Sequence, residues 1–192
     1  MKHSIFALEL CLRLDPGSTL RAELHDIVTK HPEISDPGDK WNMLHRVCEL
    51  LMANEELFER GCWDFFDTDK KAKSDYEMWC NGLITEEGAR PTPSGESDPY
   101  RPQARYMTFT IALLLVADSK SERKLSDVCN VRDDLLWSRS TFHRILKGLK
   151  HVNFAFVKSD VLYLIPGDEG WGLTDADLQA EKFEYLRPLQ AG

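Results

Sequence analysis

Hydrophobic and polar positions alternate along residues 4–14. Four apolar side chains share one side of this segment: Phe6, Leu8, Leu10 and Leu12. Glu9 and Arg13 fall on the other side. A period of two is typical of a strand with one face in the core, so the pattern predicts a half-buried strand with Glu9 on its outer face.

The helical spacing of apolar residues appears in three segments that follow. The first segment is residues 20–31. This helix is expected to end near His31, because Pro32 disfavours a helical conformation in the residue before it. Residues 41–51 and 70–87 show the same spacing, and Gly88 is expected to stop the second of these helices. Residues 62–66 are rich in aromatic side chains and fit either a strand or a helix.

The C-terminal half mixes strands and helices. Residues 106–117 are apolar and partly β-branched, which predicts a central strand buried on both faces. Further helices are expected over residues 125–131, from Asp133 or Ser140 to residue 149, and from a capping box at Thr174 to about residue 184. The apolar segments 152–157 and 161–165 form either a hairpin or one long irregular strand.

One segment stands out as a linker. Residues 90–103 contain four prolines among Ser, Gly and Asp, which predicts a loop between a helical N-terminal half and a mixed C-terminal half. The 192 residues suit one domain, so we expect a single domain over 1–192. The fold class expected is α+β, with amphipathic helices packed on a small, mostly antiparallel sheet.

Charge and composition narrow the classes of function. The net charge of −8 weighs against nucleic acid as a partner, because an acidic chain repels phosphate backbones. The longest uncharged apolar run, residues 107–117, is shorter than the roughly 20 residues of a membrane span. The N-terminus does not read as a signal peptide, and five widely spaced cysteines suggest free thiols, so we expect a cytoplasmic protein.

The familiar motifs of catalysis and cofactor binding are missing. No Gly-x-Ser-x-Gly, phosphate-binding glycine loop or paired zinc-ligand motif occurs, so we expect no enzyme activity, no cofactor and no metal. One acidic cluster leaves cation binding open: Asp168, Glu169, Asp175 and Asp177. It lacks the spacing of an EF-hand, and two of these carboxylates also suit the first turn of a helix.

A basic stretch raises a DNA-binding alternative. Its four principal cations are Arg139, Arg144, Lys147 and Lys150. If the segments 152–157 and 161–165 form a wing, residues 125–165 can be interpreted as a winged helix-turn-helix. The competing interpretation is a solvated helix face that balances the acidic remainder of the chain.

The C-terminal half resembles a known family, the domain of unknown function 1517, found in cyanobacterial and plastid-envelope proteins. The similarity lies in residues 106–117, 161–169 and 173–178 and is most specific at 185–189, which reads Tyr-Leu-Arg-Pro-Leu. The resemblance implies an α+β fold and no established activity, and it transfers no catalytic residues. Many members also carry a membrane segment and a Gly-rich stretch, which this chain does not show.

Because no site chemistry emerges, the leading hypothesis is a non-enzymatic adaptor that binds another protein, with an unknown pathway and oligomeric state. Trp171, between glycines, and Tyr100, in the Pro-rich segment, are its candidate contact residues. The winged-helix regulator is the alternative. A third hypothesis is a hydrolase or ligand-binding protein whose site is assembled from residues distant in sequence.

Overall fold

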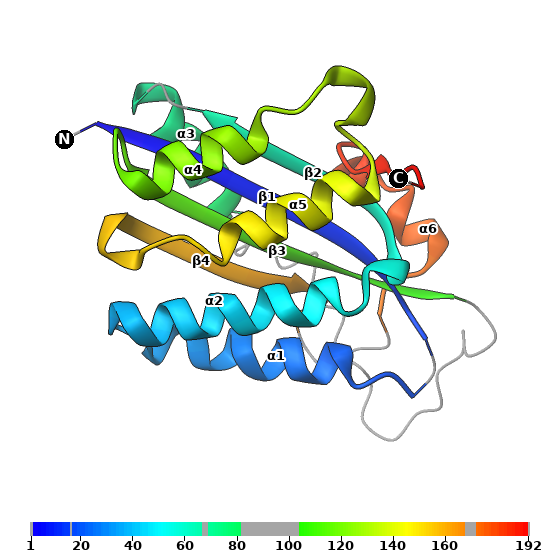
Figure 1. Ribbon diagram of the computed structural model, residues 1–192. Coiled ribbons are helices and arrows are strands. Elements are labelled where there is room, and N and C mark those ends of the chain that lie inside the picture. The colour runs from blue at the N-terminus through cyan, green and yellow to red at the C-terminus, as the bar shows by residue number, and fades with distance from the viewer. Residues whose placement is uncertain (1, 16, 67–68, 82–103, 168–171, 192) are drawn as a thin grey trace.

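An antiparallel sheet with the N-terminal strand at its centre organises the molecule (Figure 1). The computed structural model describes residues 2–15, 17–66, 69–81, 104–167 and 172–191. The sheet order is β4-β3-β1-β2-β5, and every neighbouring pair is antiparallel. Its strands are β1 (His3–Leu14), β2 (Phe58–Phe66), β3 (Arg105–Val116), β4 (Val157–Ile165) and β5 (Arg187–Pro188). The expected α+β class is confirmed.

Four helices cover one face of the sheet, which we call the helical face. They are α1 (Leu20–Lys30), α2 (Pro37–Met52), α4 (Lys120–Cys129) and α5 (Arg139–Leu149). Figure 1 shows α4 and α5 in front of the strands, with α1 and α2 below them in the view, on the side of β4. The alternating side chains Phe6, Leu8, Leu10 and Leu12 of β1 are fully buried here. Burial of this apolar area is the main force that holds the two layers together.

The opposite face of the sheet, which we call the second face, is also covered. Helix α3 (Asp69–Asn81) lies behind the strands in Figure 1, and its Ala72 and Tyr76 pack in a cluster with Ile5 and Ala7 of β1. A C-terminal segment of helix α6 (Asp175–Leu178) and a 3₁₀ turn at Glu181–Phe183 forms another cluster. That cluster surrounds Cys11 with Leu173, Leu178, Phe183 and Leu186.

The prediction that one face of the N-terminal strand is exposed is wrong, because α3 and the C-terminal segment cover the second face. The strand itself is confirmed, but residues 3–12 are buried whichever face they point to. The predicted burial of the strand at residues 106–117 on both faces is confirmed, since β3 lies between β1 and β4 with its side chains almost entirely buried.

Local capping moves several helix boundaries from their expected places. Helix α4 starts at Lys120 because the Ser119 side chain accepts from the Glu122 amide, and α5 starts at Arg139 because Ser138 caps it in the same way. The expected terminal helix is split into α6 and the 3₁₀ turn, although its capping box at Thr174 is confirmed. Part of the helix predicted over 70–87 and the whole linker at 90–103 lie outside the described residues.

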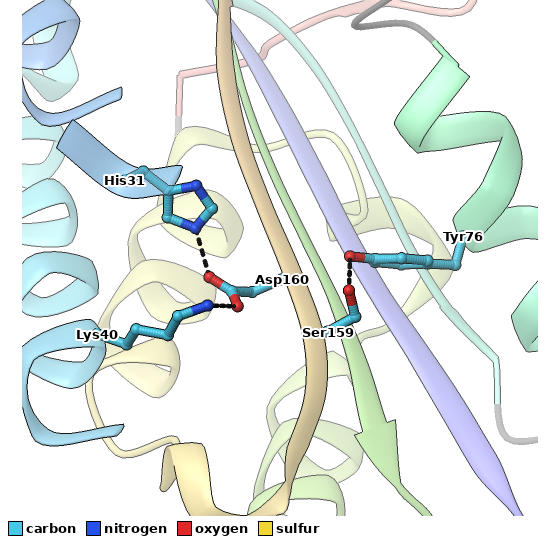
Figure 2. Close-up of polar contacts among 5 residues, drawn as sticks. All are labelled: His31, Lys40, Tyr76, Ser159 and Asp160. Carbon is cyan, nitrogen blue, oxygen red and sulfur yellow. Dashed lines mark hydrogen bonds and ion pairs between the residues drawn. The ribbon is translucent and has the colours of Figure 1, made fainter. Parts of the chain in front are cut away.

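The segments that the sequence left open are now assigned. Residues 62–66 belong to strand β2. A 3₁₀ turn at Phe154–Phe156 leads into β4, a single strand that pairs with β3, so the hairpin alternative for residues 152–165 is wrong. Ser159 and Asp160 stay within β4 because each side chain has a partner in one of the two layers that cover the sheet, as Figure 2 shows.

Strand β4 joins the two layers through side chains on its opposite faces (Figure 2). On the helical face, Asp160 Oδ2 lies 2.5 Å from His31 Nε2, and Asp160 Oδ1 accepts from Lys40 at the start of α2. On the second face, the Tyr76 hydroxyl of α3 donates to Ser159 Oγ at 2.8 Å. Burial alone raises the pKa of Asp160, but the hydrogen bonds from His31 and Lys40 outweigh it, so the pKa is lowered.

We predict that Asp160→Asn destabilises the protein by roughly 3 kcal/mol, because it leaves Lys40 and His31 without their anionic partner at a buried site. A lowered pKa means that the stability from Asp160 is complete above its unfolded value of 3.8 and is lost as pH falls through the folded pKa. The difference between wild type and variant should therefore shrink in acid. Urea unfolding across this pH range measures it.

The matched control is Asp134→Asn, which breaks an exposed pair between Arg132 and Asp134 at 2.7 Å. Exposed pairs contribute little, so the expected loss is below about 1 kcal/mol. Equal losses in the two variants would contradict the structural role assigned to Asp160.

Candidate functional site

Glu9 is a buried carboxyl at the centre of the sheet. It lies on the second face of β1, directly opposite Thr110 of β3 and Cys62 of β2. Only 1% of the residue is exposed. Its Oε2 accepts a hydrogen bond from the Tyr185 hydroxyl at 2.8 Å, and its Oε1 has no hydrogen-bond partner among the described residues. A buried polar atom without a partner is costly, so it marks a place where a ligand atom can bind.

The electrostatic state of Glu9 follows from this burial. Loss of water raises the pKa of its carboxyl, while the hydroxyls of Tyr185, Thr108 and Thr110 lower it in part. The two threonine hydroxyls lie on neighbouring β3, but neither forms a hydrogen bond of ordinary geometry. The net pKa is raised above its ordinary value of 4.5, because burial outweighs these hydrogen bonds.

A cavity of about 360 Å³ opens beside Glu9, between α3 and the C-terminal segment. Its described walls are mainly apolar, and four aromatic side chains form much of them: Trp79, Tyr163, Phe183 and Tyr185. The cavity exists because α3 and the C-terminal segment cover the second face as separate clusters, one around Ala7 and the other around Cys11. Glu9 lies between these two residues on β1.

Polar groups in the same cavity add a second acid and a thiol. Burial raises the pKa of Asp64, while nearby Lys71 lowers it and Asp75 raises it. Burial also raises the pKa of the Cys62 thiol to about 12, so this sulfur stays protonated at neutral pH. Lys182 also lines the cavity, with its Nζ 5.3 Å from the centre of the Phe183 ring.

A second cavity of about 350 Å³ lies at the start of α2, against residues 151–154. The polar groups of its described walls bind within the protein. Trp41 Nε1 donates to the Lys150 carbonyl at 3.1 Å, and Asn153 Oδ1 accepts from the Ala155 amide at 2.9 Å. None of the buried atoms without a partner lies in these walls, which makes the Glu9 cavity the stronger candidate.

The cations of the DNA-binding alternative lie along α5, but most of them bind the protein itself. Arg139 Nε donates to the Phe58 carbonyl at 3.1 Å, and an Arg144 nitrogen donates to the Asp127 carbonyl at 2.9 Å. Lys150 pairs with Glu49, and Lys147 is exposed. Strand β4 is a single strand, so residues 152–165 form no hairpin wing, and DNA binding by these cations stays a prediction.

The remaining predicted site residues are placed only in part. Trp171, Tyr100, Asp168 and Glu169 lie outside the described residues. Asp177 belongs to the capping box with Thr174, and Asp175 lies beside the Tyr106 hydroxyl, whose pKa is raised chiefly by burial. Over the described ranges, no group of three or more His, Cys, Asp or Glu is arranged to hold a metal ion. No described helix has the length and apolar character needed to cross a bilayer.

Sequence reasoning missed Glu9 as a functional residue, although the chain contains a signal for it. Ile5, Ala7 and Cys11 share the face of Glu9 in a strand of period two, and all three are apolar. A lone acid among apolar neighbours on one face indicates a buried carboxyl. The cavity itself had no such signal, because its walls come from segments far apart in the sequence.

Comparisons with protein-family models, curated proteins and solved structures return no match. The resemblance to the domain of unknown function 1517 therefore stays a prediction, and the functional argument rests on the geometry of this chain alone.

We predict that Glu9→Gln stabilises the protein, and increasingly so as pH rises above about 4.5, the ordinary value for this carboxyl. A raised folded pKa means that wild type loses stability as pH climbs from the unfolded towards the folded pKa, with a slope of at most about 1.4 kcal/mol per pH unit. Glutamine keeps the shape without the charge. Thermal or urea unfolding of both proteins over this pH range measures the difference.

Glu184→Gln is the control, because Glu184 is exposed and adjacent to Tyr185. Its expected effect on the free energy of unfolding is below about 0.5 kcal/mol. A Glu9→Gln variant that is less stable than wild type throughout would show that the carboxylate is stabilising, contrary to this interpretation.

Proposed function

We propose that this chain is a non-enzymatic binding protein that takes a small organic molecule into the cavity beside Glu9. The observation that carries the proposal is the Glu9 carboxyl itself. It is 1% exposed, lines the cavity and has one oxygen without a partner among the described residues. Natural proteins keep few such atoms, and a bound ligand is one of the explanations for them.

The size and lining of the cavity support the same function. Small-molecule pockets range from about 300 to 1,000 Å³ and combine apolar walls with a few polar groups that orient the ligand. At about 360 Å³, with aromatic walls around a single buried carboxyl, the cavity suits a compact ligand. Tyr163 and Tyr185 keep their hydroxyls bonded, the former to the Trp79 carbonyl at 3.2 Å and the latter to Glu9. Two of the walls are therefore held in place before a ligand arrives.

Binding without chemistry is favoured by the state of the potential nucleophiles. The Cys62 thiol has a pKa of about 12, and burial raises the pKa of Tyr163 and Tyr185 as well. The described walls contain no histidine that could act as a general base. A protonated thiol and two phenols bind and orient a ligand but do not attack it.

The adaptor hypothesis stays a prediction beside this one. Its contact residues, Trp171 and Tyr100, lie outside the described residues, so the geometry neither supports nor opposes a protein partner. A cytoplasmic location likewise stays a prediction.

We predict that prodan, a neutral naphthalene dye whose emission shifts to the blue in apolar surroundings, binds wild type with one site per chain. In Cys62→Phe, the added ring occupies the cavity next to Glu9, so affinity for prodan should fall at least tenfold. Fluorescence titration measures both affinities, and a fall in excitation transfer from tryptophan to the dye in Trp79→Phe reports whether the dye is in this cavity.

The control is Cys129→Phe, the same substitution at a half-buried cysteine on the helical face. Circular dichroism establishes that each variant is folded, and the control is expected to bind prodan as wild type does. If wild type does not bind prodan, or if Cys62→Phe binds it equally well, the proposed function is wrong.

A further inference from the structure

We propose that the ligand of this cavity is an organic ammonium compound, with its cationic nitrogen bound to the Glu9 carboxylate and its apolar part between the aromatic walls. The inference rests on the proposed function and names the class of ligand. It follows from three features of the cavity: the Glu9 oxygen without a partner, the aromatic side chains of the walls, and the charged groups that line it.

Tyr185 makes the one hydrogen bond of ordinary geometry that the Glu9 carboxyl receives from the described residues. Tyr185 donates to Oε2 at 2.8 Å, whereas Oε1 has no partner among the described residues. The groups that face Glu9 from the neighbouring strands are neutral: the hydroxyls of Thr108 and Thr110 on β3, and the Cys62 thiol on β2. A ligand that brings both an N–H donor and a positive charge supplies what this carboxyl lacks.

Aromatic side chains surround the place that the ligand would take. Trp79 comes from α3, Tyr163 from β4 and Phe183 from the C-terminal segment, and Tyr185 follows that segment directly. The faces of such rings attract cations, and clusters of them are a recurrent way of binding organic ammonium groups. The chain already shows this interaction nearby, since Lys71 Nζ lies 3.3 Å from the centre of the Phe66 ring.

The charge of the cavity has the sign that a cation requires. Two acids, Glu9 and Asp64, line it together with Lys182. Burial is the main cause that raises the pKa of both acids, so each is ready to gain from a nearby positive charge. An anionic ligand would instead increase the cost of ionising them. The charges therefore select an ammonium compound over a carboxylate or phosphate of similar size.

Binding of the cation is coupled to a proton. Without ligand, burial shifts the Glu9 carboxyl towards the neutral acid. When the ammonium group binds, the Glu9 O–H bond breaks, its proton leaves to solvent, and the carboxylate keeps the electron pair and accepts an N–H from the ligand. Affinity for the ligand should therefore rise with pH, because less work is needed to remove this proton. The rise ends where the ligand amine itself loses its charge.

The test compares two probes of the same shape, phenylbutylammonium and phenylbutanol, as competitors of prodan. We expect wild type to bind the ammonium probe at least tenfold more tightly than the alcohol at about pH 8. In Glu9→Gln this preference should disappear. Between about pH 5 and about pH 8, affinity for the ammonium probe should rise in wild type and in Glu184→Gln but not in Glu9→Gln.

The outcomes separate the inference from the proposed function. The ammonium assignment is overturned if prodan binds in the cavity but the alcohol competes as well as the ammonium probe, or neither competes at millimolar concentration. It is equally overturned if the preference for the cation survives in Glu9→Gln. In those cases small-molecule binding stands and only the ligand class is wrong. If prodan itself does not bind wild type, the proposed function fails first. The pH dependence in wild type provides the second measurement if Glu9→Gln does not fold.

Discussion

The burial of β1 on both faces is the constraint on which the rest of the structure depends. Four helices cover one face of this strand, and α3 and the C-terminal segment cover the other. A strand in that position is expected to carry apolar side chains throughout. Glu9 is the exception, and because it is 1% exposed, its carboxyl must either stay uncharged or acquire a partner from outside the chain.

Two buried acids of this protein have opposite pKa shifts, and the difference explains their roles. Asp160 receives hydrogen bonds from His31 and Lys40, which lower its pKa despite burial and tie two helices to β4. Glu9 has only hydroxyl groups to counter its burial, so its pKa is raised. Asp160, which has cationic partners within the protein, stabilises the fold. Glu9, which has none among the described residues, would instead stabilise a complex with a cationic ligand.

The sequence predicts those elements of the fold that are determined by residues close together in the chain. The period of two in β1, the apolar run of β3 and the capping box at Thr174 are local, and the sequence predicted these elements. The exposure of β1 was predicted wrongly because α3, some sixty residues away in the chain, covers its second face. The sequence left a hairpin and one long strand open for residues 152–165, and the partners of Asp160 on α2 and of Ser159 on α3 keep these two polar residues in a strand.

The cavity could not be predicted for the same reason. It arises where two separately packed segments meet the sheet on either side of Glu9, and no stretch of sequence encodes that gap. What the sequence did contain was the pattern Ile5, Ala7, Glu9, Cys11 on one face of a strand. A lone acid in such a row identifies the residue, while its unpartnered oxygen and the aromatic walls around it become visible only in three dimensions.

The most direct measurement is the titration of the Glu9 carboxyl carbon by nuclear magnetic resonance in the ligand-free protein, with its signal assigned by its loss in Glu9→Gln. A carboxyl that is buried without a cation should titrate above 4.5, the ordinary value for this group, and its carbon shift should still be that of the acid at that pH. A shift that changes at or below 4.5 would show that Glu9 is solvated or already paired with a cation, and would contradict both the burial of β1 on its second face and the binding site built on it.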